Sequence, residues 1–133
     1  MYNFTLEELT HYNCKARVYA LGINGRFPFK EFVYAIKNDP NLAPELGDLI
    51  PSIKYFANGN HPFLPKTKFR KVSLGKLPYS VYEAKSSQLR TYLFTDENGV
   101  INILGGHKTD QKLDLEYIKT IVKEYHNSKK KNR

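Results

Sequence analysis

Apolar residues recur at two spacings along the chain, and the change between them separates predicted helices from predicted strands. Up to about residue 60, most of them lie three or four positions apart, which is the spacing of one face of an α-helix. From Lys68 onward they alternate with polar residues, as in strands with one buried face. An earlier segment, residues 14–21, alternates as well, with Ala16, Val18 and Ala20 on the apolar side. The pattern therefore predicts a strand, helices, several strands and a last helix.

Two helices are predicted after the first strand, which should end in a turn over residues 22–25. The first helix carries Phe29, Val33 and Ile36 on one face. Pro28 suits its first turn, because the amide hydrogen that proline lacks would have no partner at that position.

The second helical pattern contains a proline. Its apolar face is formed by Leu46, Leu49, Ile50, Ile53 and Phe56. Asn58-Gly59 supplies a C-terminal stop, because glycine accepts the left-handed conformation in which many helices end. Pro51 removes a backbone hydrogen bond and its ring crowds the preceding turn. The sequence therefore predicts either a helix that begins near Pro51 or two short helices that meet there.

An antiparallel meander is predicted from the period-two pattern in the second half of the chain. Its four strands are residues 68–74, 80–85, 89–96 and 100–104. Glu97-Asn98-Gly99 joins the last two strands, and this sequence indicates a hairpin because asparagine and glycine tolerate the positive φ of tight turns.

A last amphipathic helix and a short tail complete the chain. The apolar face of this helix is formed by Leu115, Ile118, Ile121, Val122 and Tyr125. Asp110 or Asp114 is suited to cap its N-terminus, because a carboxylate accepts hydrogen bonds from the free amides there. The basic residues 129–133 predict a frayed tail after a single domain of residues 1–128.

Together these elements predict an α+β fold. The N-terminal strand and two helices would pack on a mostly antiparallel, twisted sheet of four to five strands, and the C-terminal helix would pack back on the domain. Helices on one face of the sheet would leave the other face open to a ligand.

Charge and cysteine content narrow the partners and the compartment. A net charge of +8 and a pI near 9.5 favour an anionic partner, and nucleic acid first. Cys14 is the only cysteine, which excludes a disulfide framework and a thiolate zinc cluster, and it reads as a small buried side chain. The scattered histidines and the lack of a phosphate-binding glycine loop predict no metal and no cofactor. Without an apolar leader or span, the chain is expected to be cytoplasmic and to bind no membrane.

The candidate chemistry is a set of basic side chains on the predicted strands, with aromatic side chains between them. Basic groups pair with phosphates and aromatic rings stack on unpaired bases, so the mixture indicates single-stranded RNA. The residues expected to bind RNA are Lys68, Arg70, Lys71, Tyr92, Lys108 and Lys112.

Alternation along the strands places two further basic residues. Lys85 shares a face with Glu83, and Arg90 shares a face with Tyr92. If the two faces coincide across the ladder, Lys85 and Arg90 lie close together and form an anion site. A salt bridge between Lys85 and Glu83 is the alternative.

Four short pieces of the second half occur in a recognisable order. They are Ser73-Leu74-Gly75, Val81-Tyr82-Glu83-Ala84-Lys85, Leu89-Arg90-Thr91-Tyr92-Leu93-Phe94 and the run from Ile103 to Lys112. They resemble the "LG-x-x-LYELR", "YR-V-x-Y-F" and "GFKKKTQKTP" stretches of RelE/HigB-type toxins and of related phage-derived proteins in the RelE/ParE superfamily. The resemblance covers roughly residues 68–125.

This resemblance implies a RelE-like fold and the toxin of a type II toxin-antitoxin system. Such a toxin is an mRNA interferase, a ribosome-dependent endoribonuclease that needs no metal because the RNA's own 2′-hydroxyl attacks the phosphate. Its partners would be mRNA, the ribosome and a cognate antitoxin. Lys85 and Arg90 take the places of two family arginines and would stabilise the phosphate in the transition state. His107 would act as general acid or base, and Tyr125 would stack on a base or transfer a proton.

Departures from the family pattern leave other functions open. Lys85 lacks the planar fork with which arginine grips phosphate. His107 stands where an aromatic residue or lysine is usual, and Tyr125 shares the apolar helix face and is equally suited to the core. A non-catalytic relative with the same fold, either a gyrase poison or a phage-type regulator, is the alternative, followed by a general RNA-binding accessory protein.

Overall fold

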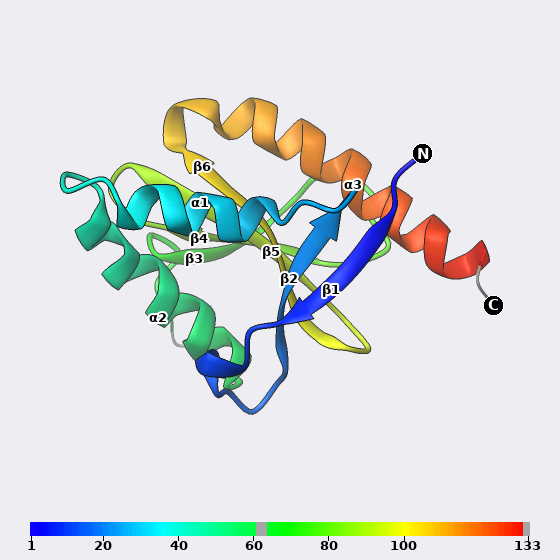
Figure 1. Cartoon of the computed structure of the whole chain (residues 1–133), viewed down its shortest axis with the longest axis horizontal. Coiled ribbons are helices and arrows are strands. Elements are labelled where there is room, and N and C mark those ends of the chain that lie inside the picture. The colour runs from blue at the N-terminus through cyan, green and yellow to red at the C-terminus, as the bar shows by residue number, and fades with distance from the viewer. Residues whose placement is uncertain (61–63, 132–133) are drawn as a thin grey trace.

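A central sheet lies between helices in the computed structural model, which describes residues 1–60 and 64–131 (Figure 1). The strands are β1 (Phe4–Glu8), β2 (Val18–Ile23), β3 (Phe69–Val72), β4 (Val81–Lys85), β5 (Leu89–Asp96) and β6 (Gly99–His107). The helices are α1 (Pro28–Lys37), α2 (Leu46–Ala57) and α3 (Gln111–Lys131), with short 3-10 turns η1 (Thr10–Tyr12), η2 (Ala43–Glu45) and η4 (Lys108–Asp110). The predicted α+β class is confirmed.

The sheet has six strands in the order β1-β2-β6-β5-β4-β3, so the prediction of four to five strands was wrong. β2 and β6 run parallel, whereas all other neighbours are antiparallel. The meander from β3 to β6 and its hairpin at Glu97-Asn98 are confirmed. The additional strand is β1, which pairs with β2 at one edge of the sheet.

The first predicted strand and turn are both displaced towards the C-terminus. β2 begins at Val18, and Cys14 lies before it, half-buried, with burial raising the pKa of its thiol. The turn is made by Asn24 and Gly25, which have φ angles of 52° and 82°. Gly22 belongs to β2, where a β carbon would lie only 2.1 Å from the Thr5 hydroxyl oxygen of β1.

α1 forms as predicted, but both expectations for α2 were wrong. α2 is one continuous helix that begins at Leu46 and contains Pro51. The hydrogen bond that Pro51 cannot donate would go to the carbonyl of Gly47 in the first turn, so the helix loses a single bond close to its N-terminus. Leu49 and Ile53 are completely buried, and this packing keeps the helix continuous across the proline.

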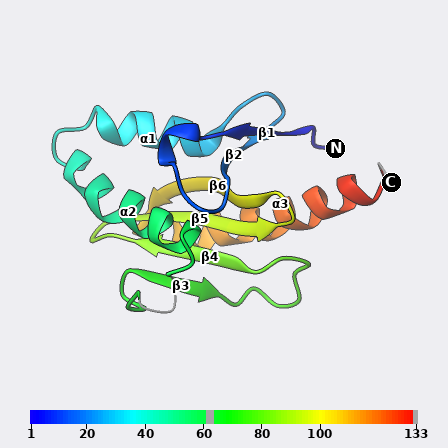
Figure 2. The ribbon, with the colours of Figure 1, turned by 90° about the horizontal axis from the view of Figure 1, so that it is seen from below.

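Each face of the sheet carries its own hydrophobic core. The core between the sheet and α1 and α2 includes Val18, Ala20, Phe29, Ile53, Phe56, Leu89 and Leu93. The core between the sheet and α3 includes Leu21, Val81, Phe94, Ile101, Ile103, Ile118 and Val122. Figure 2 shows α2 in front of the sheet and α3 behind it. The expectation of an open sheet face was therefore wrong, because β5 and β6 are apolar on both faces and need cover on both.

α3 extends into the predicted tail. Its apolar face packs as expected, with Ile118, Ile121 and Val122 completely buried. The helix continues to Lys131, so the expectation of fraying from residue 129 was wrong up to that point, and residues 132–133 lie outside the described part. Among residues 1–60 and 64–131, none of the helices combines the length with the apolar character that crossing a membrane requires.

Candidate nucleic-acid interface

The strand register brings the predicted phosphate-binding residues to one end of the sheet. Lys85 lies directly opposite Arg90 in the β4–β5 ladder. The Lys85 amide donates a hydrogen bond of 2.8 Å to the carbonyl of Lys68, the residue before β3, so Lys68 lies next to Lys85. On the other side, the Lys108 amide donates to the Gln88 carbonyl at 2.8 Å. We call this region the cationic end; it comprises Lys68, Arg70, Lys85, Arg90, His107 and Lys108.

Lys85 and Arg90 also share a face of the sheet. Val81 and Glu83 are buried beneath α3, and alternation puts Lys85 on that same side of β4. The expected coincidence of the two strand faces is therefore confirmed by the ladder pairs Glu83–Tyr92 and Lys85–Arg90. Two adjacent positive charges repel each other when no anion lies between them.

The Arg90 guanidinium braces the turn between β4 and β5. Its Nη1 donates to the carbonyl oxygens of Ser86 and Leu89, at 2.7 and 2.8 Å. Its Nε is buried and has no hydrogen-bond partner in the part of the chain that the structure describes. Arg90 is thus fixed in position, with part of its donor capacity already used by the backbone.

A carboxylate from the other half of the chain holds the same turn. Glu45, at the end of η2, accepts hydrogen bonds from the Ser86 hydroxyl and from the Gln88 amide, the latter at 2.8 Å. Burial alone would raise the pKa of Glu45, but these hydrogen bonds and the charge of Arg90 lower it overall. The ionised carboxylate therefore offsets part of the repulsion between Arg90 and Lys85.

Beneath the cationic end lies a buried carboxylate, Glu83, which has no exposed surface. It accepts hydrogen bonds from Arg70 Nε at 2.9 Å and from Gln111 Nε2 at 2.5 Å. The alternative prediction of a Lys85–Glu83 salt bridge was wrong, because Arg70 takes the position of the basic partner. Arg70 is consequently engaged in the protein and is less available to RNA than predicted.

Tyr92 and the half-buried Asp114 lie in the same polar layer beneath the cationic end. Tyr92 has no exposed surface, so the predicted stacking on an RNA base was wrong for this residue. Its pKa is raised by burial and then by the charges of Glu83 and Asp114. Burial and neighbouring Asp110 also raise the pKa of Asp114. Gly106 makes room for Asp114, since a β carbon there would lie 2.4 Å from a carboxylate oxygen.

The predicted catalytic residue His107 and the remaining predicted RNA-binding residues are exposed, but their side chains lie on different faces of the molecule. His107 ends β6 opposite Leu89, whose side chain lies in the core under α1 and α2, so alternation turns His107 to the sheet face opposite that of Lys85 and Arg90. The structure brings the three residues to one end of the sheet but not to one face. Lys112 is exposed in the first turn of α3. Lys71 is exposed as well, but alternation along β3 turns it to the sheet face opposite that of Arg70.

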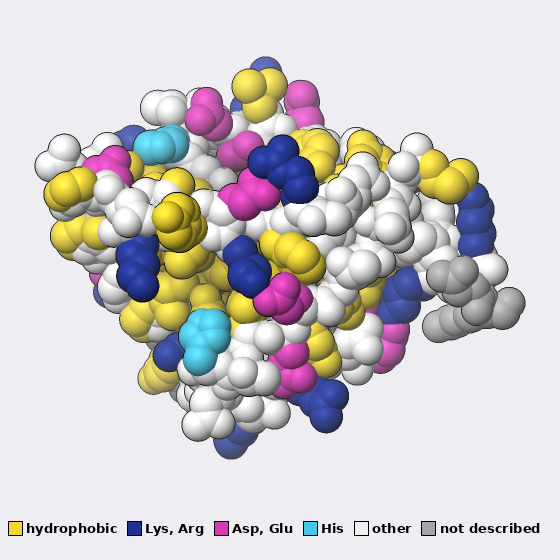
Figure 3. Space-filling model, viewed as in Figure 1, with side chains coloured by type: hydrophobic (Ala, Val, Ile, Leu, Met, Phe, Trp, Pro, Cys, Tyr) yellow, Lys and Arg dark blue, Asp and Glu magenta, His cyan; other side chains and the backbone are white. Residues whose placement is uncertain are grey.

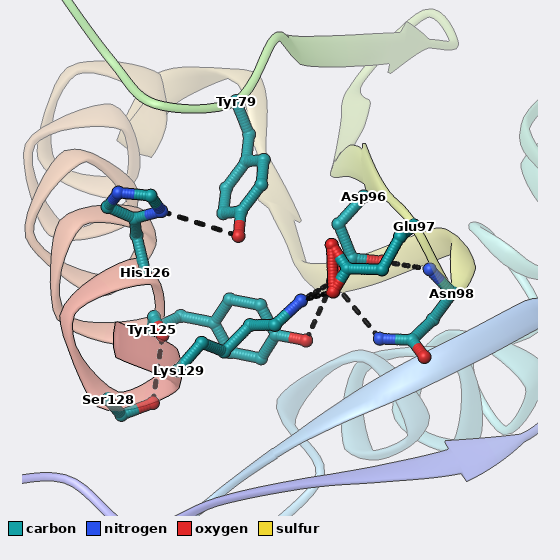
Figure 4. Close-up of polar contacts among 8 residues, drawn as sticks. All are labelled: Tyr79, Asp96, Glu97, Asn98, Tyr125, His126, Ser128 and Lys129. Atoms are coloured by element: carbon teal, nitrogen blue, oxygen red, sulfur yellow. Dashed lines mark hydrogen bonds and ion pairs between the residues drawn. The ribbon is translucent and has the colours of Figure 1, made fainter. Parts of the chain in front are cut away.

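Tyr125 lies beside Asp96, the last residue of β5, and its hydroxyl points towards that carboxylate (Figure 4). Its hydroxyl donates to Asp96 Oδ2 at 2.9 Å, and the Lys129 ammonium reaches the same oxygen at 3.1 Å and also contacts Glu97. Asp96 ends β5 whereas Arg90 is near its start, a separation of about 20 Å at 3.3 Å per residue. The structure does not bring Tyr125 to the cationic end, and burial of its ring does not suit the predicted role in base stacking or proton transfer.

The ionisation of this second cluster favours its hydrogen bonds. Burial works to raise the pKa of Asp96, but the Asn98 amide, Tyr125 and Lys129 lower it overall. Burial and the Asp96 carboxylate raise the pKa of Tyr125. The cluster therefore joins the hairpin to α3 through an ionised carboxylate and a protonated phenol.

Sequence reasoning did not find the carboxylates and the amide that support the cationic end. Glu45, Gln111 and Asp114 come from segments far from β4 and β5, and the local pattern marks only Asp114, as a candidate helix cap and not as a site residue. The one available signal was Gly105-Gly106 after an apolar strand, which marks a close approach to the backbone. Among the described residues, no group of three or more histidine, cysteine or carboxylate side chains is placed to hold a metal ion.

Comparison with models of protein families, with curated proteins and with solved structures gave no match.

Proposed function

We propose that the protein is the toxin of a type II toxin-antitoxin system and cleaves ribosome-bound mRNA at the cationic end. The observation that carries this proposal is the pairing of Lys85 with Arg90 across β4 and β5, flanked by Lys68 and Lys108. Basic groups that converge from separate strands suit a phosphodiester, because it carries charge in the ground state and more in the transition state. The resemblance of residues 68–125 to RelE/HigB-type toxins supports the same conclusion.

The proposed reaction is an internal displacement at phosphorus. The 2′-oxygen bonds to the phosphorus and the bond to the 5′-oxygen breaks, which leaves a 2′,3′-cyclic phosphate and a 5′-hydroxyl. His107 serves as the proton-transfer group, since an imidazole can accept and donate a proton and this one is exposed at the same end of the sheet as the paired cations. The Lys85 ammonium neutralises the crowded phosphorane, while Arg90 contributes charge and fixes the turn.

The proposed setting is the cytoplasm, with a cognate antitoxin as protein partner. A chain of net charge +8 associates readily with anionic surfaces. A partner that covers this charge would therefore prevent the chain from binding RNA.

The test is cleavage of a translated mRNA by the purified protein in the presence of ribosomes. Replacing His107 with glutamine should slow cleavage about 10²–10⁴-fold, the usual contribution of one acid-base group. Lys85→Gln together with Arg90→Lys should abolish it, while Lys123→Gln on the exposed face of α3 serves as the matched control. A substrate with a 2′-deoxy residue at the cleaved position should be resistant, and excess chelator should have no effect.

Two outcomes would contradict the proposal. Unchanged cleavage by the Lys85 and Arg90 double variant would show that the reaction does not need the residues on which the proposal rests. Products with a 5′-phosphate would exclude attack by the 2′-hydroxyl, whichever residues are involved.

A non-catalytic function is the second candidate, and the bonding of Arg90 favours it. A guanidinium that donates to Ser86 and Leu89 keeps fewer donors for phosphate, and Arg70 is already paired with Glu83. A gyrase poison or a phage-type regulator with this fold would arrest growth while mRNA stays intact. Induced DNA damage without transcript cleavage after expression would therefore favour it over the nuclease.

A further inference from the structure

A hollow of about 280 Å³ lies between α1 and the connection from β1 to β2, away from the cationic end. It is lined by Leu9, His11, Tyr12, Phe29, Lys30, Val33, Tyr34 and Lys37. Figure 3 shows this face of the molecule, where apolar side chains gather below α1 and basic ones stand around them. None of the lining residues belongs to the cationic end, so a ligand here need not compete with RNA.

The floor of the hollow is the edge of the hydrophobic core. Leu9, Tyr12 and Phe29 are each at most 7% exposed, yet they line an opening to solvent. Tyr34 projects from α1 with 72% of its surface exposed and forms one wall. An exposed tyrosine beside an apolar depression is typical of protein interfaces, because the ring supplies a large contact area at a low entropic cost.

The rim of the hollow is positive. Lys30, Lys37 and His11 line it, and the Lys54 ammonium lies 5.5 Å from the centre of the Tyr12 ring. Glu7 pairs with Lys30 at 2.5 Å and neutralises part of this charge. In the part of the chain that the structure describes, Lys37 and Lys54 form no ion pair with an acidic side chain. The rim therefore keeps positive charge that a ligand could pair with.

The size of the hollow and the charge of its rim limit which ligands can bind there. At about 280 Å³ the hollow is smaller than most cofactor pockets, and it suits a few apolar side chains. A second copy of the chain is disfavoured, because each copy carries a net charge of +8 and would bring further cations to a positive rim. Carboxylates next to large apolar side chains complement the surface in both respects.

We infer that this hollow docks an acidic amphipathic segment of a partner protein. Apolar side chains of the segment would enter between Val33, Tyr34 and Tyr12, and its carboxylates would face Lys37, Lys54 and His11. The inference does not depend on the proposed nuclease function, because it concerns separate residues and needs no RNA.

The experiment is selection of binding peptides from a display library of random 16-residue sequences, with the full chain immobilised. The enriched peptides should combine two or more large apolar residues with several Asp or Glu residues. Binding of the best peptide, measured by fluorescence anisotropy, should weaken at least tenfold in Val33→Asp and in Lys37→Glu. Lys123→Glu makes the same charge change on the far helix α3 and should bind the peptide within about twofold of the wild-type affinity. Circular dichroism establishes that each variant is folded.

Several results would overturn the inference. Enrichment of basic peptides, or of acidic ones that bind Val33→Asp as well as the wild type, would show that the hollow is not the site. A concentration-dependent dimer that Val33→Asp abolishes would assign the surface to a second copy. Binding to phosphatidylglycerol vesicles that Val33→Asp abolishes, with no peptide enriched, would assign it to an anionic lipid surface. Neither RNA cleavage nor its absence affects these outcomes.

Discussion

Single carboxylates determine which basic residues of the cationic end are available to a ligand. Glu83 engages Arg70, and Glu45 holds the turn in which Arg90 is fixed. Lys85 is half-exposed and Lys68 and Lys108 are exposed, so these three ammonium groups provide the accessible charge. The arginines are thus mainly architectural, and the lysines are the groups that we expect to respond most directly to a bound phosphate.

Replacing Glu83 with glutamine should reveal the structural part of this arrangement. Arg70 and Gln111 donate to different carboxylate oxygens, and glutamine replaces one of these with an NH2 group, which cannot accept a hydrogen bond. We expect the free energy of unfolding to fall by about 1.5 kcal/mol, the lower part of the range for a hydrogen bond to a charged group, since Arg70 is partly exposed. Urea denaturation measures the change, and Glu116→Gln on the exposed surface of α3 is the matched control. A loss no larger than that of the control would contradict the assignment.

Asp114 should make stability depend on pH in a direction opposite to that of most carboxylates. Its pKa in the folded protein is raised above the ordinary 3.8, first by burial and then by Asp110, so the folded state holds the proton to higher pH. As pH rises from about 4, the unfolded state ionises first, and the folded state loses stability relative to it. The Asp114→Asn variant lacks this effect, so its unfolding free energy should rise relative to the wild type between pH 4 and pH 7. Urea titrations across this range measure the difference, and a constant difference would refute the expectation.

The residues of the site were predictable only where a local pattern existed. Alternation along β4 and β5 was enough to place Lys85 beside Arg90, because the hairpin fixes their register. Tyr92 was assigned to RNA although it is buried, since alternation identifies a face of a strand but not what covers that face. The covering element is α3, whose position follows from tertiary packing.

At the scale of elements, α3 is attached to the β5–β6 hairpin by the Asp96 cluster. Replacing Tyr125 with phenylalanine removes one donor to a buried carboxylate and should lower the unfolding free energy at pH 7 by about 1.5–3 kcal/mol. The pKa of Asp96 is lowered in the folded state, so its contribution is present above the ordinary 3.8 and is lost as pH falls below that value. The cost of Tyr125→Phe should therefore shrink in acid, as measured by urea denaturation at pH 7 and pH 3.

The same variant separates a structural role of Tyr125 from a catalytic one. Tyr125→Phe should cleave RNA at the wild-type rate under conditions in which it is folded, because Asp96 and the cationic end are at opposite ends of β5. Tyr117→Phe, on the outer surface of α3, is the control for loss of a phenol alone. A selective loss of cleavage in Tyr125→Phe would return this residue to the reaction.

The elements that the sequence predicted well are those with a repeating local signal. The Glu97-Asn98 hairpin and the amphipathic α1 and α3 fall into this class. β1 was missed because its five residues offer only Phe4 and Leu6 as apolar positions at an exposed sheet edge. The parallel pairing of β2 with β6 joins segments about 80 residues apart, for which no local pattern exists. α2 was misjudged because a propensity penalty at Pro51 was weighed without the packing of Leu49 and Ile53.

At the scale of the whole molecule, burial of both sheet faces leaves ligand binding to edges and ends. The runs in β5 and β6 that are apolar on both faces were visible in the sequence as near-continuous hydrophobic stretches. These stretches predict that helices cover both faces of the sheet. The cationic end and the α1 hollow are accordingly both at the margins of the sheet, one suited to phosphate and the other to apolar and acidic side chains.

The net charge of +8 predicts salt-sensitive RNA binding, and the slope of that dependence tests where the RNA lies. For single strands, the logarithm of the affinity falls with the logarithm of salt concentration by about 0.7 per phosphate contact. If the strand crosses the cationic end, replacing Lys85 and Lys108 with glutamine removes two contacts and should reduce the slope by about 1.4. Lys123→Gln with Lys130→Gln removes the same charge from exposed positions further along α3 and should lower affinity slightly without changing the slope. Anisotropy titrations of a labelled RNA between about 50 and 200 mM KCl give both slopes. Equal slopes for the two double variants would mean that the RNA is attracted by the whole charge of the molecule and is not bound at the cationic end.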